Sequence, residues 1–276
     1  MSTVKDSYFY DSLVQSIVTE SNRIRADPTC YIPLLEEYMT YFKEDNIIYK
    51  PNANPIETYE GINAYQAAIK FLKKQKPLST LTFDDRLAKA SVDHVNDLGP
   101  KGLYSHDSTD GKNASERIEK YCEWENACAE NIDLGSQTGQ DVIISLLVDD
   151  GLEKKIHREH LFREELTHFG VSAGPHKDYE TIVVIDYTGG VRELGKPFFD
   201  KSTYKYDFPS DLDKKKERNT KPKTSYQLQD EDAPDGTIEV KMKKELRIWD
   251  GRKNKVTRKY YTLNSGSSHV VEIEEL

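Results

Sequence analysis

Two histidines and two or three carboxylates in one stretch of the chain have the residue types of a small reactive site. His106 follows Tyr-Ser, Glu130 precedes Asn-Ile, Asp149 and Asp150 precede a glycine, and His157 precedes an arginine. Imidazole nitrogens can bind zinc, and a carboxylate can hold or deprotonate the water on the metal. These residue types allow a metal site or an acid/base site.

Spacing alone does not bring the two histidines together. His106 and His157 lie 51 positions apart, and no helical or strand period joins them. The alternative is one loop histidine and one surface histidine in a highly charged chain. Spacing by itself favours this alternative.

Periodic patterns predict the elements that would have to position these residues. Apolar residues at helical spacing predict helices over residues 8–26 and 84–98, and a third is expected over 138–149. Strands are expected over 167–174 and 180–187, the second an almost continuous apolar run. Helices that come first and strands that come late favour an α+β arrangement in layers.

The character of the chain changes after residues 1–190, which we expect to form one domain. Residues 191–235 are highly charged with scattered prolines, which predicts a linker or an arm. In residues 236–276 apolar and polar residues alternate around a turn at Asp250-Gly251, which predicts a small antiparallel β unit of about three strands. Three strands alone are marginally stable, so this unit should pack on the first domain or on another protein.

The distribution of charge limits the class of partner. Residues 200–276 carry 17 Lys and Arg against 15 Asp and Glu, whereas residues 1–199 carry 22 against 33. A body this acidic argues against nucleic acid or an anionic membrane as the main partner. No stretch of 18 apolar residues occurs, so we expect no transmembrane segment.

The N-terminus and the cysteines favour a cytoplasmic protein. The first residues lack the apolar core of a signal peptide. Cys30, Cys122 and Cys128 are an odd number with no metal-binding spacing, so we expect free thiols in a reducing compartment.

Short motifs occur along the chain in a specific order. They are Asn22-Arg23-Ile24-Arg25, Leu87-Ala88 through His94 and Leu98, Tyr104-Ser105-His106, Asp110-Gly111 with Arg117, Glu130-Asn131-Ile132, His157-Arg158, Phe169-Gly170-Val171 and the strand 181–187. In this order, residues 8–190 resemble the CAP superfamily of cysteine-rich secretory proteins, antigen-5-type allergens and pathogenesis-related proteins, also called the SCP domain. The resemblance implies a three-layer α-β-α sandwich, here followed by the linker and the small antiparallel β extension.

The resemblance also implies a cleft in which two histidines and two acidic residues converge and can hold zinc or another divalent ion. Carried over one at a time, these residues are His106, Glu130, Asp149 and His157. Asp150 is the reserve candidate for the second acid. If the protein is an enzyme, the catalytic groups would be Glu130 and Asp149.

The sequence departs from the family pattern beside this cleft. Ala129 and Ile156 replace glycines, and a β-branched isoleucine would narrow the cleft. We interpret this as a cleft kept more for its fold than for its chemistry. Of the other histidines, His94 is expected to be partly buried with its hydrogen bonds satisfied, and His160 and His168 to lie at surface or supporting positions.

We therefore expect a non-enzymatic CAP-domain protein that acts by binding, as a scaffold subunit of a larger intracellular protein assembly. The linker and the β unit would be its docking element. The His157-Arg158 motif resembles the corresponding motif of protist members of the family, and this resemblance points to a cytoskeletal or ciliary assembly. Two alternatives stay open: a zinc-dependent hydrolase with Glu130 as general base, and a lipid or sterol carrier, which needs an exposed apolar groove.

Overall fold

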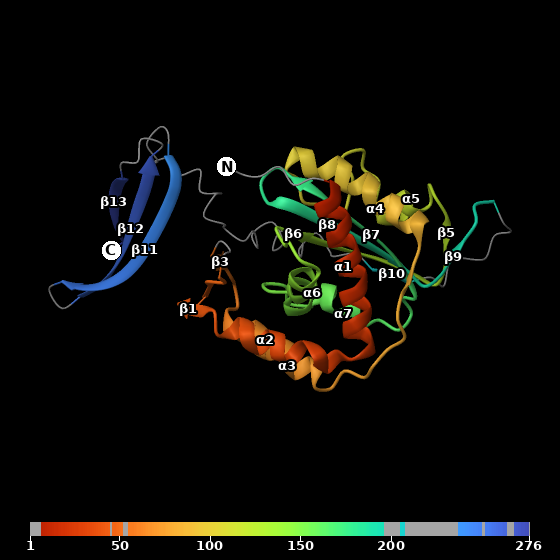
Figure 1. Cartoon of the computed structure of the whole chain (residues 1–276), viewed down its shortest axis with the longest axis horizontal. Helices are drawn as coiled ribbons and strands as arrows, with labels where there is room; N and C mark the ends of the chain where they lie inside the picture. Colours follow the sequence, from red (N-terminus) through yellow and green to blue (C-terminus); the bar gives the residue numbers. More distant parts are fainter. Residues whose placement is uncertain are drawn as a thin grey trace. The chain divides into compact units, whose positions relative to one another are not determined.

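The structure of the chain, a computed structural model, falls into two compact units. It describes residues 7–44, 46–51, 55–195, 205–207, 237–249, 252–263 and 268–275. The first unit contains the helices and a five-stranded sheet, and the second contains three long strands near the C-terminus (Figure 1).

Seven α-helices and two short 3₁₀ helices lie in the described part of the first unit. They are α1 (Ser7–Ala26), η1 (Pro28–Tyr31), α2 (Ile32–Met39), α3 (Ile62–Leu72), α4 (Asp85–Leu98), η2 (Gly99–Lys101), α5 (Ala114–Ile118), α6 (Gly139–Val148) and α7 (Ile156–Leu161). Leu13, Ile17 and Ile24 are buried at 3%, 0% and 0% exposure, because their spacing places them on one face of α1. The helices predicted over 8–26, 84–98 and 138–149 are confirmed as α1, α4 and α6.

The first unit is built on a sheet with the strand order β10-β6-β8-β7-β4. The strands among the described residues are β1 (Phe42–Glu44), β2 (Ile47–Ile48), β3 (Ile56–Glu57), β4 (Thr82–Phe83), β5 (Glu123–Trp124), β6 (Ala127–Leu134), β7 (His168–His176), β8 (Glu180–Thr188), β9 (Val191–Arg192), β10 (Lys205–Asp207), β11 (Thr237–Trp249), β12 (Arg252–Leu263) and β13 (Ser268–Glu275). Strand β8 pairs antiparallel with both β6 and β7, and the edge strands β4 and β10 pair in parallel. The sequence predicted β7 and β8 but not β6.

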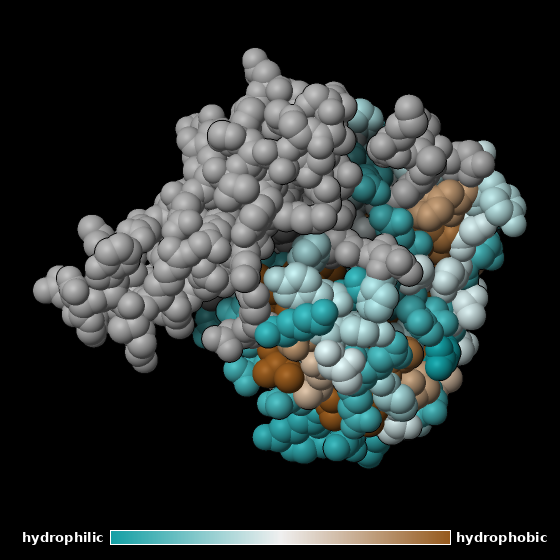
Figure 2. Space-filling view, turned by 60° about the vertical axis from the view of Figure 1, so that its left-hand side comes forward, coloured by the Kyte–Doolittle hydropathy of each residue, from teal (hydrophilic) through white to brown (hydrophobic). Residues whose placement is uncertain are grey.

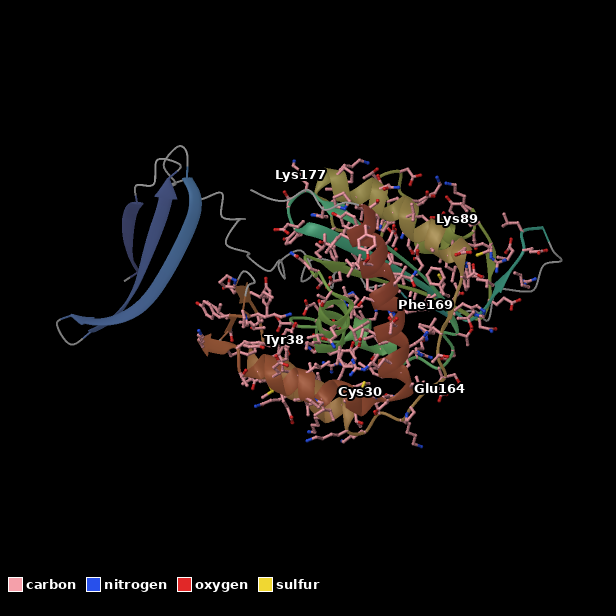
Figure 3. All side chains as sticks on the ribbon, viewed as in Figure 1. Cys30, Tyr38, Lys89, Glu164, Phe169 and Lys177 are labelled. Atoms are coloured by element: carbon pink, nitrogen blue, oxygen red, sulfur yellow. The ribbon has the colours of Figure 1, made fainter. Side chains whose placement is uncertain are left out.

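Helices cover both faces of this sheet, which confirms the three-layer α-β-α sandwich (Figure 1). Helix α4 packs on β7 and β8, and α1 packs against α6 and β7. On one face Phe169 is fully buried and stacks on Tyr187, with ring centroids 6.4 Å apart. Figure 3 shows Phe169 within the unit, whereas Lys89 and Lys177 lie at its periphery.

Hydrophilic residues dominate one face of the described part (Figure 2). In Figure 2 hydrophilic residues cover most of the visible described face, with small hydrophobic areas between them. The large hydrophobic side chains that are exposed are Tyr8, Tyr59, Phe83, Val92, Leu103 and Leu194. Among the described residues, none of the helices has the length and apolar character that crossing a membrane requires.

The second unit contains an antiparallel sheet with the order β11-β12-β13, which confirms the predicted β extension. The predicted turn at residues 250–251 lies outside the described residues. The predicted linker, 191–235, also lies outside them except for 191–195 and 205–207. Within that range, β9 pairs with β5 and β10 pairs with β6.

Candidate functional site

Strand β6 carries two consecutive polar residues that reach the two helical layers. Because successive side chains on a strand point to opposite faces, Glu130 and Asn131 face opposite sides of the sheet. Glu130 meets His106, which lies between η2 and α5. Asn131 lies toward α7, where its Nδ2 donates to the backbone oxygen of His157 at 3.2 Å and its Oδ1 lies 2.7 Å from His160 Nδ1.

The first half of the candidate site is a buried pair between His106 and Glu130. His106 Nδ1 lies 2.6 Å from Glu130 Oε1, and the two residues are 2% and 0% exposed. Arg117 on α5 binds the other carboxylate oxygen and also donates to the backbone oxygen of His106 at 3.0 Å. The histidine ring is thus held through its side chain and its backbone.

Arg117 is placed by the start of α5. Asn113 and Glu116 form a reciprocal capping box, in which Glu116 N donates to Asn113 Oδ1 at 3.1 Å and Asn113 N donates to Glu116 Oε2 at 2.9 Å. Burial alone would raise the pKa of Glu130, but the Arg117 guanidinium and the neighbouring histidines outweigh burial and lower this pKa to about 2. Glu130 is therefore an anion at neutral pH.

The second half of the site is a buried pair between Asp149 and His157. Asp149 ends α6 in a left-handed conformation with φ 54°. Its carboxylate accepts from the backbone N–H of His157 at 2.9 Å and of Arg158 at 3.2 Å, and it lies 2.8 Å from His157 Nδ1. One aspartate thus fixes both the ring of His157 and the first turn of α7.

Arg158 joins the two helices of this half. Its guanidinium donates to the backbone oxygens of Leu147 and Val148 at the C-terminal end of α6, the second at 2.9 Å. These carbonyls have no partner within a helix, and a cation favours the negative end of the helix dipole.

The two pairs meet. The ring centroids of His106 and His157 lie 6.5 Å apart, and their planes make an angle of 32°. In the tautomer that donates Nδ1–H to a carboxylate, the imidazole carries its lone pair on Nε2, the nitrogen that can bind a metal ion or accept a proton. The fold therefore brings together all four residues of the predicted set.

A family model described as the cysteine-rich secretory protein family, CAP, matches residues 22–187. This match covers more than half of the chain, including all four residues. The chain belongs to the CAP family. No curated protein matches it.

Two solved structures are similar to parts of this CAP protein. An extracellular protein containing an SCP domain from Bacillus anthracis str. Ames is 21% identical, with a TM-score of 0.34, over 40% of this chain and 34% of the other. An outer surface protein from Borrelia burgdorferi is 23% identical, with a TM-score of 0.35, over 46% of this chain and 89% of the other. The CAP protein thus spans about a third of the length of the Bacillus protein.

The candidate site of the CAP domain offers two imidazoles, those of His106 and His157, as possible ligands of one ion. Two imidazoles on one zinc ion, bound at about 2.0–2.1 Å, have ring centroids roughly 5–6 Å apart, whereas these centroids lie 6.5 Å apart, so the two rings would have to move closer to share one ion. Within the part of the chain that the structure describes, no three His, Cys, Asp or Glu side chains are arranged to hold one ion. His106 and His157 would hold the metal, which would polarise a bound water, while Glu130 and Asp149 orient the rings. Zinc binding stays a prediction.

Three buried residues near these four were not assigned to the candidate site from the sequence. His94 is fully buried, 4.0 Å from Glu130 Oε2, and its Nε2 lies 2.8 Å from the backbone oxygen of Ser105. Asp186 pairs in register with Glu130, and burial together with the Glu130 charge raises the pKa of Asp186 well above its usual value. In the sequence, Asp186 could have been noticed as a single acidic residue inside the apolar run of the strand predicted over 180–187.

His160 is the third of these residues, and it is fully buried against Asn131. A surface position for it is therefore wrong; His160 lies against Asn131, which binds the backbone oxygen of His157. The reserve acid, Asp150, accepts from the backbone N–H groups of Tyr59 at 2.6 Å and Glu60 at 2.9 Å. It is Asp149 that meets His157.

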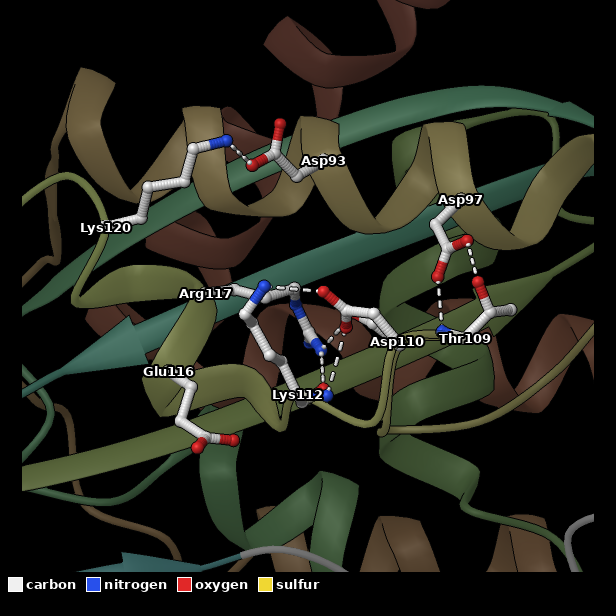
Figure 4. Close-up of a pocket in the computed structure, with 9 residues that line it drawn as sticks. Asp93, Asp97, Thr109, Asp110, Lys112, Glu116, Arg117 and Lys120 are labelled. Atoms are coloured by element: carbon white, nitrogen blue, oxygen red, sulfur yellow. Dashed lines mark hydrogen bonds and ion pairs between the residues drawn. The ribbon is translucent and has the colours of Figure 1, made fainter.

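A pocket of about 380 Å³ lies beside the candidate site, between α4, α5 and the loop that joins them (Figure 4). Its lining residues are Asp93, Asp97, Ser108, Thr109, Asp110, Lys112, Glu116, Arg117 and Lys120. Most of its charges are already paired, as in Lys120 with Asp93 at 2.7 Å. Arg117 lines this pocket and also binds Glu130, so one guanidinium connects the pocket to the site.

Proposed function

We propose that this CAP protein acts by binding another protein, with the CAP domain as a rigid module and the C-terminal β unit as the docking element. The observation that carries the proposal is the three-stranded sheet β11-β12-β13, which lies in the second unit. A three-stranded sheet needs a covered hydrophobic face to be stable, and unpaired strand edges readily add a further strand. Both properties favour the binding of this sheet to another protein.

The chemistry of Glu130 supports a non-enzymatic role. A general base works best when its pKa lies near the working pH, and the pKa of Glu130 is about 2. Arg117 and His106 already occupy its two oxygens. Glu130 is suited to holding the fold of the cleft.

We extend the proposal to a scaffold subunit of a larger intracellular assembly, cytoskeletal or ciliary. Support for this location comes from the resemblance of His157-Arg158 to protist members of the family. Cross-linking mass spectrometry on the native complex should give cross-links from lysines of residues 237–263 to another protein. A protein that stays monomeric, captures no partner and keeps its location after deletion of 200–276 contradicts the proposal.

A zinc-dependent hydrolase is the second candidate, because each histidine is bound through Nδ1 to a carboxylate, an arrangement common around metals. The deciding experiment compares the zinc content of the wild type with that of the double variant His106→Ala, His157→Ala. Zinc bound by the wild type and lost in the variant keeps this candidate. Equal zinc content in both proteins ends it.

A further inference from the structure

The segment between α6 and α7, which leads to His157, contains residues in an unfavourable backbone conformation. Asp149, Gly151 and Lys155 all adopt left-handed conformations, with φ of 54°, 79° and 51°. Glycine accepts this conformation freely and aspartate tolerates it, but a lysine side chain clashes with its own backbone there. Such residues persist when contacts from elsewhere in the fold hold them in place.

Those contacts come from the two residues before the turn into α3. The carboxylate of Asp150 accepts from the backbone N–H groups of Tyr59 and Glu60. In return, Glu60 Oε1 accepts from the backbone N–H of Gly151 at 2.7 Å and binds the ammonium group of Lys155. The two segments therefore exchange hydrogen bonds in both directions.

The exchange continues to the candidate site. Lys155 Nζ also donates to the backbone oxygen of Asp149 at 2.9 Å. The carboxylate of the same aspartate binds the backbone N–H and the ring Nδ1 of His157. Glu60 is thus connected to the imidazole through two residues, although it lies 97 positions before His157 in the chain.

We propose that Glu60 is a positioning residue for His157. Its carboxylate binds Gly151 and Lys155 in the left-handed segment 149–155, and these contacts keep the Asp149–His157 pair in place. The inference concerns the cleft and does not depend on the proposed docking role of the β unit. The side chain of Glu60 is 39% exposed and that of Lys155 is 17% exposed. Glu60 can therefore be replaced without opening the hydrophobic core.

The test is NMR spectroscopy of the full chain carrying Glu60→Ala. We expect the amide protons of His157 and Arg158, which donate to Asp149, to exchange with solvent about 10-fold faster. The ring ¹⁵N signals of His157 should shift as its Nδ1 contact weakens. Amides of β8 should exchange at the wild-type rate, which separates a local effect from global destabilisation.

Two further variants sharpen this test. Glu60→Gln keeps an oxygen for the Gly151 N–H and loses the charge that binds Lys155, so its effects should lie between the wild type and Glu60→Ala. Glu36→Ala replaces an exposed glutamate of α2 and should leave the His157 signals unchanged. The proposal is overturned if Glu60→Ala leaves the amide exchange and ring signals of His157 at wild-type values. It is also overturned if the β8 amides accelerate by the same factor.

Discussion

At the scale of single residues, Glu130 shows how a buried charge is kept in the CAP domain. His106 and Arg117 bind its two oxygens, and His94 lies 4.0 Å away. A buried ion pair adds little net stability, but removal of one partner leaves a charge without compensation. The buried charge of Glu130 is therefore tolerated only while the guanidinium of Arg117 is bound to it.

Replacement of Arg117 by methionine should destabilise the protein strongly. Arg117→Met leaves the Glu130 anion buried without its guanidinium, and we expect a loss of about 3–5 kcal/mol in the free energy of unfolding near neutral pH. Urea denaturation measures the loss. Lys120→Met removes a charge from an exposed pair in the same pocket and should change little. Similar losses in both variants would contradict the assigned role of Arg117.

Replacement of Asp186 by asparagine should change how stability depends on pH. The pKa of Asp186 is raised by burial and by Glu130, so its contribution is fully present below the unfolded value of about 3.9 and is lost as pH rises through the raised folded pKa. Asparagine stays neutral. Asp186→Asn should therefore gain stability relative to the wild type as pH rises through this window, by at most about 1.4 kcal/mol per pH unit.

Urea denaturation from pH 4 to pH 8 measures this difference. Asp11→Asn, at an exposed position on α1, provides the background. A difference between Asp186→Asn and the wild type that is the same at every pH would show that Asp186 does not titrate as inferred.

At the scale of elements, the close contact between α4 and β7 depends on Gly170. A Cβ atom at this position would lie 2.0 Å from the backbone nitrogen of Ala88 and 2.2 Å from the carbonyl carbon of Leu87. These are backbone atoms, so they cannot move without moving the helix. The same helix carries Ser91, whose hydroxyl lies 2.8 Å from Asp186.

Gly170→Ala should therefore separate α4 from the sheet. We expect a loss of about 1–3 kcal/mol from overpacking, measured by thermal or urea denaturation. At Gly190 the nearest atom to an added Cβ is the carboxylate end of the Glu125 side chain, at 3.0 Å, which can move. Gly190→Ala is the matched control, and an equal loss in both variants would contradict the proposed backbone clash.

At the scale of the whole molecule, the charge distribution decides what the chain attracts at a distance. The chain has a net charge of −9, and its negative charge is concentrated in residues 1–199. Phosphate backbones are repelled by such a surface, since nucleic-acid binding depends on clustered lysine and arginine.

We expect the full chain not to shift a DNA or RNA duplex in a gel at about 0.15 M salt, and to be retained on an anion exchanger at low salt. The measurement is an electrophoretic mobility-shift assay over a range of salt concentrations. Micromolar binding that weakens as salt rises would show a basic surface that the charge count does not reveal.

Much of the fold and of the candidate site could be predicted from the sequence. Local patterns are sufficient for α1, α4 and α6, since helical periodicity and capping residues act within a few positions. The order of short motifs was sufficient for the CAP fold and for His106, Glu130, Asp149 and His157 as a set.

The tertiary structure alone decided how those four residues are paired and what holds them. Strand β6 was not predicted, because Glu130, Asn131 and Asp133 are polar residues in a strand whose first seven residues are all buried. Only contacts from other elements make their burial favourable. The same holds for the choice of Asp149 over Asp150 and for the link from Glu60 to His157. These depend on left-handed residues and on hydrogen bonds between segments about 90 positions apart, which no local pattern in the chain encodes.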